Sequence, residues 1–262
     1  MRSILVYADH GKSTPARLQS ALALGRATGG HVTVLVDTPL SPYLSIDGFG
    51  SGFVATDMLR EALERDDKFG VAIAEQLARE DVAFDVVRSD DETVDAMTTV
   101  GRLADVAVVS HGCRFAGELA LRGACPVLVV PEAGLLTQPV DVACVAWDGG
   151  NEAARALREA VPLLALAGQV HVLTVTEAEK TGGFPPTDAL RYLSRHGVKA
   201  ELHEVARVAS VEQSLAGAVA LRGAQLLVMG AYGHRRLTEF LMGGVTRYFL
   251  DIVTPPALLL AH

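Results

Sequence analysis

Four closely spaced glycines form the clearest candidate site of this chain. The stretch GAYGHRRLTEFLMGGVTRYF, residues 230–249, follows an apolar run directly and carries Gly230, Gly233, Gly243 and Gly244. The apolar spacing after the last pair predicts a helix that begins at these glycines. A helix start without Cβ atoms exposes several backbone N–H groups with the helix dipole behind them, and this arrangement binds phosphate groups.

The spacing alone leaves a second interpretation open, in which the glycines only turn the chain. The stretch is not G-x-x-x-x-G-K-[ST], because no lysine follows the glycines, and its intervals differ from G-x-G-x-x-G. Asp148 raises the same question. Its carboxylate, at the end of an apolar run, could contact a ligand or could form a turn with the glycines that follow it.

The elements that must position these residues occur twice along the chain, as an internal repeat. The segment SILVYADHGKSTPARLQSALALGRATGGHVTVLVD begins the sequence, and DVACVAWDGGNEAARALREAVPLLALAGQVHVLTVTE begins its second half. Each gives an apolar strand that ends in aspartate, a turn with glycine, an Ala/Leu-rich helix and a second strand. Continuous apolar strands between amphipathic helices are typical of parallel sheets that are covered on both faces.

The fold class predicted from this repeat is α/β, with two Rossmann-like, doubly wound parallel-sheet domains in tandem. We expect the first domain over residues 1–133 and the second over 139–262, joined near PEAGLLTQPVD. The halves differ in two places. The first inserts a Gly/Ser/Pro-rich loop and a charged helix at 38–67, and the second is ten residues longer at the glycine stretch.

Composition excludes several classes of protein. A formal net charge of -8 argues against a nucleic-acid-binding surface, which needs clustered Lys and Arg. No apolar run approaches the ~20 residues that span a bilayer, so no membrane contact is expected. The three cysteines form no C-x-x-C pair and fit a reducing compartment, which predicts a cytoplasmic protein. The spacing of His111, Cys113 and Cys125 fits no closed zinc pattern, and no metal site is expected.

Taken together, these motifs resemble the universal stress protein (UspA-type) family. The resemblance rests on VAWDGG, HVLTVTE, LLVMGAYG, the nine-residue spacer 234–242 and GGVT, which combine into G-x2-G-x9-G. It covers nearly the whole chain as two tandem copies and implies domains of the adenine nucleotide alpha hydrolase-like type. It also implies that the final strands of the two halves, in CPVLVVP and PALLLAH, pair or pack across a pseudo-two-fold axis, as an intramolecular dimer.

Family members with the full motif bind ATP or a related adenine nucleotide, with or without Mg²⁺. By resemblance, the first strand of the second half would contact the ribose, the second strand the adenine, and the glycine stretch the ribose and phosphates. The corresponding residues of this chain are Ala146, Trp147, Asp148, Val175, Met229, Gly230, Gly233, Gly243, Gly244, Val245 and Thr246. The first half has Ser110 and Cys113 at the first two glycine positions, and we do not expect it to bind a nucleotide in the same way.

One position departs from the family pattern. ATP-binding members usually carry Ser or Thr directly after the third glycine, where this chain has Gly244. The lost hydroxyl donor would weaken phosphate binding by about 0.5–1.5 kcal/mol if nothing replaced it.

The resemblance and the glycine stretch together predict a stress-response protein that binds ATP, ADP or AMP in its second half and acts as a sensor or regulator. The sequence contains no recognisable nucleophile–base pair, so we expect no catalytic residues and at most slow ATP hydrolysis. The alternative is a ligand-free interaction module whose partner surface lies on the 38–67 insertion. Both readings leave an unknown protein partner and a homodimer open.

Overall fold

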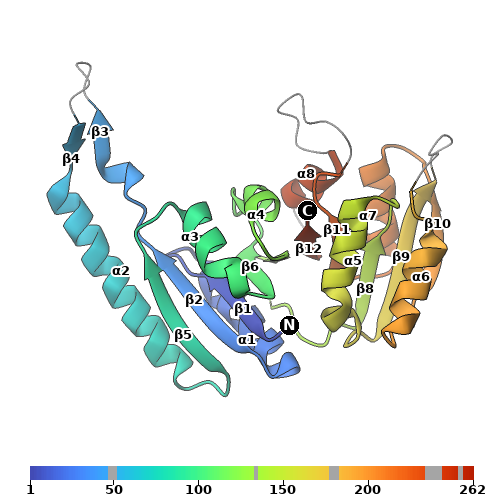
Figure 1. Ribbon diagram of the computed structural model, residues 1–262, viewed down its shortest axis with the longest axis horizontal. Helices are drawn as coiled ribbons and strands as arrows, with labels where there is room; N and C mark the ends of the chain where they lie inside the picture. The colour runs from blue at the N-terminus through green and yellow to red at the C-terminus, as the bar shows by residue number, and fades with distance from the viewer. Residues whose placement is uncertain (47–51, 133–134, 177–182, 234–243, 253–255) are drawn as a thin grey trace.

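The structure is a computed structural model that describes residues 1–46, 52–132, 135–176, 183–233, 244–252 and 256–262. Strands and helices alternate along both halves of the chain (Figure 1). The strands are β1 (Ser3–Tyr7), β2 (His31–Asp37), β3 (Leu44–Ile46), β4 (Gly52–Val54), β5 (Ala83–Ser89), β6 (Val106–Ser110), β7 (Val127–Val130), β8 (Val142–Ala146), β9 (Gln169–Thr176), β10 (Glu201–Ala206), β11 (Leu226–Gly230) and β12 (Ala257–Ala261).

Helices connect the parallel strands. They are α1 (Thr14–Thr28), α2 (Thr56–Leu77), α3 (Thr93–Val100), α4 (Ala116–Arg122), α5 (Asn151–Leu164), α6 (Pro186–Arg195), α7 (Val211–Leu221) and α8 (Gly244–Asp251), with short 3₁₀ turns at Ser41–Tyr43 and Gly101–Leu103. Across the described part of the chain, no helix combines the length and the apolar character needed to cross a membrane.

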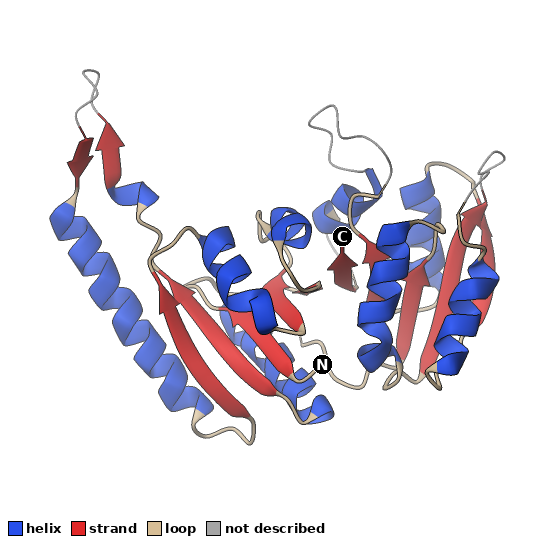
Figure 2. Cartoon of the chain, viewed as in Figure 1, coloured by secondary structure: helices blue, strands red, loops and turns tan. Residues whose placement is uncertain are grey.

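Ten of these strands form one continuous sheet. Their order is β10-β9-β8-β11-β12-β7-β6-β1-β2-β5, and every neighbouring pair is parallel except β12 and β7. Figure 2 shows the strands of the two halves on either side of this antiparallel junction. The predicted α/β class with two Rossmann-like, doubly wound units is confirmed.

The junction joins the last strand of each half. Leu258, Leu259 and Leu260 of β12 pair antiparallel with Val129, Leu128 and Val127 of β7. The sequence therefore predicted correctly that these two strands meet. All residues of both strands are buried, because helices cover the sheet on both faces, and this explains why their sequences are uninterrupted apolar runs.

Each face of the sheet carries its own apolar core, and each core runs through both halves. Helices α1, α2, α5 and α6 cover one face, where Leu18 and Leu157 are packed. Helices α3, α4, α7 and α8 cover the other face, where Met97 and Phe249 are packed. The fold thus has three layers, with helices of both halves on each face of the shared sheet.

The insertion after β2 contains more regular structure than the sequence predicted. We expected a loop leading into a helix, but the segment forms a two-stranded antiparallel hairpin of β3 and β4 before α2. The hairpin extends beyond the end of the main sheet, at the upper left of Figure 1. Leu44 and Met58, at the start of β3 and of α2, are 55% and 64% exposed.

Candidate functional site

The predicted site residues lie where the strand order of the second half reverses. The chain runs from β8 outward to β9 and β10, then returns to the opposite side of β8 as β11. Ligands of doubly wound sheets bind at the carboxyl ends of the strands at such a switch point. Trp147 and Asp148 follow the end of β8, and Met229 and Gly230 end β11, so the two sets are neighbours.

Asp148 is exposed and takes part in a tight turn. The Gly150 N–H donates to Asp148 Oδ1 at 2.9 Å, and Gly149 adopts a φ of 78°, which only glycine reaches readily. The turn fixes the carboxylate at the start of α5. The turn interpretation of Asp148 is therefore confirmed, and contact with a ligand stays a prediction for this side chain, which is exposed at the strand end.

Trp147 is buried, and both of its N–H groups donate within the protein. Its indole N–H donates to the carbonyl oxygen of Phe184 at 3.0 Å, and its backbone N–H donates to Leu173 at 2.8 Å. The Phe184 N–H in turn donates to the carbonyl oxygen of Gly149 at 3.0 Å. The segment before α6 is thereby held against the end of β8.

The adenine side of the predicted site is lined by strand residues. Val175 lies next to the end of β9 and is half-buried, as is Ala146 at the end of β8. Ala146 pairs with Leu173, which places Val175 two residues further along its strand, toward the carboxyl edge. Neither residue brings a polar side chain to this edge.

Gly230 is required by packing within the protein. A Cβ there would lie 2.6 Å from the Ala153 nitrogen and 2.7 Å from the Glu152 carbonyl carbon, because the first turn of α5 rests on the end of β11. Gly233 is less constrained, since a Cβ would meet only the Glu152 carboxylate, at 2.9 Å. Met229 is buried beside this contact.

Glu152 is a site residue that sequence reasoning missed. One of its carboxylate oxygens would lie 3.3 Å from a Cβ on Gly150 and 2.9 Å from a Cβ on Gly233. Asp148 and Glu152 therefore place two carboxylates at the edge where phosphates are expected. The available signal was position, because Glu152 stands in the first turn of the helix that follows Asp148.

The helix start at Gly244 is open. Gly244 is exposed, and a Cβ there would meet nothing within 4 Å. A hollow of about 390 Å³ adjoins it, lined also by residues of α7 and α8 that include Glu212 and Arg247. Gly243 lies outside the described residues, as do the spacer 234–242 and its histidine and arginines.

Thr246 connects the start of α8 to the loop after β11 by a hydrogen bond. Its hydroxyl oxygen accepts the Tyr232 N–H at 3.2 Å, and Tyr232 holds the left-handed φ of 57°. Thr246 is buried, whereas Val245 before it is half-buried against the core. The hydroxyl hydrogen can still donate, so Thr246 contributes at most one donor to a ligand.

The matching switch point in the first half is filled by a side chain. The guanidinium of Arg17 donates to Asp9 Oδ1 at 2.9 Å and to Ser110 Oγ at 3.1 Å, which joins the ends of β1 and β6. It also donates to Thr14 Oγ1 at 2.7 Å and lies 5.3 Å from the Tyr7 ring centroid. Arg17 is only 2% exposed, and the sequence analysis missed it, although its spacing places it on the buried face of α1.

The second half has alanine at the position of Arg17. Arg17 lies eight residues after Asp9, and Ala156 lies eight residues after Asp148, on the buried face of α5. The two aspartates occupy the same turn, because the Gly11 N–H donates to Asp9 Oδ1 at 3.1 Å just as Gly150 does to Asp148. The two halves thus share the aspartate turn, and they differ because only the first half has an arginine that bridges the strand ends.

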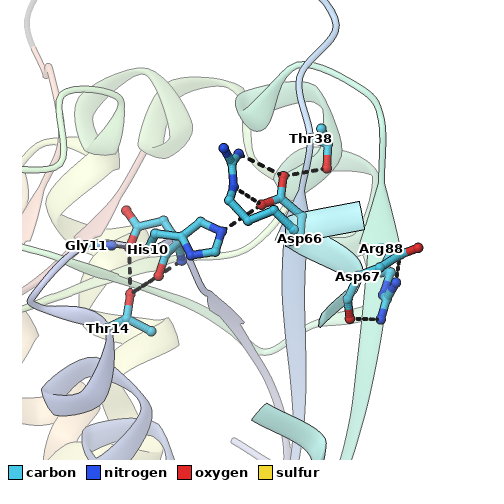
Figure 3. Close-up of polar contacts among 9 residues, drawn as sticks. His10, Gly11, Thr14, Thr38, Asp66, Asp67 and Arg88 are labelled. Carbon is cyan, nitrogen blue, oxygen red and sulfur yellow. Dashed lines mark hydrogen bonds and ion pairs between the residues drawn. The ribbon is translucent and has the colours of Figure 1, made fainter. Parts of the chain in front are cut away.

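A second polar group surrounds Asp66, on α2 beside the first-half switch point. Asp66 is buried and bonds His10 Nε2 at 2.7 Å and the Thr38 hydroxyl at 2.8 Å (Figure 3). Burial alone would raise the pKa of Asp66, but the hydrogen bonds from His10, Thr38 and Arg65 outweigh it and lower that pKa. This group fixes the insertion helix to the ends of β1 and β2.

Nearby Asp37 behaves in the opposite way. Burial raises its pKa, although hydrogen bonds from the hydroxyls of Thr93 and Tyr7 partly compensate. Burial likewise raises the pKa of the Tyr7 hydroxyl, with the charges of Asp37 and Asp9 adding to the effect. These side chains hold one another at the first-half strand ends.

Comparisons with known proteins agree with the fold. The sequence model of the universal stress protein family matches residues 140–260. A universal stress protein from Archaeoglobus fulgidus DSM 4304 superimposes with a TM-score of 0.74 at 14% identity, covering 98% of this chain and 97% of that one. A functionally unknown protein from Pseudomonas aeruginosa PAO1 gives a TM-score of 0.61 at 16% identity, covering 100% of this chain and 92% of its own. Comparison with curated protein sequences finds no match.

Proposed function

Residues 140–260 match the universal stress protein family, and from that premise we propose that the second half of the chain binds an adenine nucleotide. ATP, ADP and AMP share the adenosine that the strand ends would recognise. The bound nucleotide would make the protein a sensor or regulator. In this proposal residues 1–133 form a domain with a filled site, and residues 139–262 form the binding domain.

The observation that carries the proposal is the contrast between Arg17 and Ala156. In the first half a buried guanidinium bridges Asp9 and Ser110 across the switch point. In the second half the matching position holds Ala156, whose small side chain cannot form such a bridge. The side chain that fills the switch point of the first half is therefore missing from the second, and this difference supports a ligand site there.

The chain's own residues suggest how the nucleotide would be held. Asp148 would accept hydrogen bonds from the ribose hydroxyls, and Ala146 and Val175 would flank the adenine. The open start of α8 at Gly244, with Thr246 in its first turn, would donate backbone N–H groups to the phosphates. Met229, Gly230 and Gly233 would shape the strand end, with Gly243 beside Gly244.

The carboxylate of Glu152 fits a Mg²⁺ ion that accompanies the phosphates, because Mg²⁺ prefers oxygen ligands and is usually held by one or two carboxylates. Without the ion, Glu152 would repel the phosphate chain. We expect Mg-ATP to bind more tightly than metal-free ATP, and Glu152→Gln to reduce that difference.

The test is a titration of the protein with nucleotide. Binding is measured by calorimetry and by the fluorescence of Trp147, the only tryptophan of the chain. Gly244→Glu puts a negative charge at the open helix start without a clash, and Gly217→Glu is its matched control on α7, where a Cβ also meets nothing within 4 Å. We expect one nucleotide per chain, lost in Gly244→Glu and retained in Gly217→Glu. Asp148→Asn, which keeps a turn-forming side chain, should weaken binding.

No heat and no change in fluorescence at millimolar nucleotide would overturn the proposal. Binding that Gly244→Glu leaves intact would reject the phosphate position. In the proposal hydrolysis is at most slow, so turnover at ordinary enzyme rates would also contradict it.

A second candidate function is that of a ligand-free interaction module, and the hairpin of β3 and β4 favours it. This hairpin projects from the sheet next to exposed Leu44 and Met58. A module of this kind would keep its partner when nucleotide is removed and lose it when residues 44–54 are replaced by a short Gly/Ser linker. A sensor would bind that partner differently with and without nucleotide.

A further inference from the structure

The edge of the sheet in the second half gathers two histidines and a glutamate. Strands β9 and β10 are parallel neighbours, and His171 pairs with Glu201 while His203 lies two residues further along β10. Alternation along the strands puts the three side chains on one face, the face that α7 covers. They lie toward the amino ends of the strands, away from the nucleotide site at the carboxyl ends.

The three polar atoms are nearly equidistant. His171 Nδ1 lies 3.0 Å from His203 Nε2 and 3.7 Å from a Glu201 carboxylate oxygen, and His203 Nε2 lies 3.7 Å from the same oxygen. All three ligand atoms lie within 4.8 Å of one another. In a tetrahedral zinc site with bonds of 2.0–2.2 Å, neighbouring ligand atoms are about 3.4 Å apart. The side chains therefore need to move by only a few tenths of an ångström to share one ion.

We propose that His171, Glu201 and His203 bind one divalent transition-metal ion, with Zn²⁺ as the best fit. Two imidazoles and one carboxylate are ligands that suit Zn²⁺, whereas Mg²⁺ and Ca²⁺ prefer oxygen alone. The bound ion would cross-link the edge strand β10 to β9. Glu201 is largely exposed, so the ion would be reached from solvent and would keep a position for water or an external ligand.

His171 is buried, and its ring packs against the ring of His203, with the ring centroids 5.0 Å apart. In the absence of metal, the short distance between the two imidazole nitrogens fits a hydrogen bond in which one ring donates to the other, with the tautomers inferred from that contact.

Arg222 is a charged group that opposes the ion. It follows α7, its Nη1 donates to the Ala218 carbonyl oxygen at 2.9 Å, and its charge acts on His171. A nearby cation weakens the binding of another cation. Arg222→Gln should therefore tighten Zn²⁺ binding, which a cluster held together only by hydrogen bonds would not show.

The first half provides an internal control at the same place. Thr33 and Asp85 pair there as His171 and Glu201 do in the second half, and His31 supplies one imidazole. Asp85 accepts from the Thr33 hydroxyl at 2.8 Å and lies 2.6 Å from His31 Nε2. A hydroxyl replaces one imidazole, so this cluster has one nitrogen ligand fewer than the His171–Glu201–His203 cluster.

No metal site was expected from the sequence, in which His171 and His203 were not singled out and stand 32 residues apart. Only the register of β9 and β10 brings them together. Neither residue takes part in the nucleotide site, so the two proposals succeed or fail separately.

The experiment is calorimetric titration of the full chain with ZnCl₂ at pH 7.5, with melting temperature as a second readout. We expect one Zn²⁺ per chain and a higher melting temperature. Loss of a second-sphere group costs about 10–100-fold in metal affinity, so loss of a ligand in His203→Ala or Glu201→Gln should weaken binding by about 100-fold or more. His31→Ala is the matched control and should bind as the wild type does.

The Co²⁺ form provides an independent readout, because visible absorption of a tetrahedral Co²⁺ complex should vanish in His203→Ala even if the variant stays folded. The proposal is overturned if the wild type binds no Zn²⁺. It is also overturned if His203→Ala and Glu201→Gln bind Zn²⁺ as the wild type does, or if His31→Ala weakens binding as much as they do.

Discussion

The imidazole of His111 lies 2.9 Å from the carbonyl oxygen of Phe249. His111 follows β6 in the first half, and Phe249 belongs to α8 in the second. The last four carbonyls of a helix have no partner within it, and a residue of the other half supplies one here. A carbonyl accepts only a donor, so Nε2 of His111 carries the hydrogen in this contact. The first half thus helps to hold the helix that begins at Gly244.

His111→Ala should lower the free energy of unfolding by about 1–3 kcal/mol, because it leaves a buried carbonyl oxygen without its donor. Urea denaturation measures this loss. The exposed histidine His196, at the end of α6, provides the control, and His196→Ala should change the free energy of unfolding by less than about 0.5 kcal/mol. Equal effects of the two substitutions would show that the His111 contact contributes nothing.

The pair of Asp9 and Arg17 should make stability depend on pH. Burial raises the pKa of Asp9, but the Thr14 hydroxyl and the Arg17 charge outweigh it and lower that pKa. A carboxyl with a lowered pKa stabilises the fold above its ordinary pKa, and this contribution is lost as pH falls through the lowered value. At pH 7, Asp9→Asn should cost about 1–2 kcal/mol, at the low end for such pairs because the Asp9 carboxylate is 40% exposed.

Denaturation of the wild type and Asp9→Asn at several pH values checks this prediction. The difference between the two proteins should stay constant above about pH 4 and shrink below it. Asp90→Asn, at an exposed position directly after β5, is the control. A difference between wild type and Asp9→Asn that persists unchanged at pH 2–3 would contradict the electrostatic explanation.

Gly230 and Gly244 should differ in how well they tolerate substitution by alanine. Gly230→Ala should destabilise the protein by about 1–3 kcal/mol or more, because its Cβ would meet the backbone of α5 at 2.6 Å. Gly244→Ala should change stability by no more than about 0.5 kcal/mol, since its Cβ would meet nothing within 4 Å. Thermal melts of both variants would decide this, and a tolerated Gly230→Ala would show that α5 yields easily.

The three cysteines should be unreactive in the native state. Burial raises the pKa of Cys113, Cys125 and Cys144 to about 11 each. At pH 8 about one thiol in a thousand is then ionised, and the thiolate is the reactive form. Titration with a disulfide reagent should therefore be slow until urea unfolds the chain, when all three thiols react. Fast reaction of one thiol, removed by Cys113→Ser, would show that the loop after β6 opens.

The strands were predictable because burial leaves a direct mark on their sequences. β6, β7 and β12 are buried along their whole length, and each is a run of small and β-branched or leucine residues. The position of the candidate site was predictable for the same reason, since the repeat gives the strand order and the order gives the switch point. The ends of β8 and β11, with Asp148 and Gly230, do lie side by side.

The contacts within the site were not predictable from spacing. Ser110 meets Arg17 from 93 residues away, and Thr246 accepts from Tyr232 across the glycine stretch. Gly230 was interpreted as a position where a ligand comes close to the backbone, whereas its closest neighbour is the first turn of α5. Such contacts depend on how helices rest on the sheet, which apolar periodicity does not determine.

The antiparallel pairing of β7 and β12 has a consequence for how the two halves can diverge. Between identical subunits related by a two-fold axis, every contact occurs twice, and the interface must form from separate molecules. Within one chain the link holds the halves at an effective concentration that reaches millimolar, so a weaker and unsymmetrical interface suffices. The contact of His111 with Phe249 occurs once, since Ala231 occupies the position in the second half that matches His111. Covalent linkage therefore allows the first half to stabilise the second through a contact that the second half does not return.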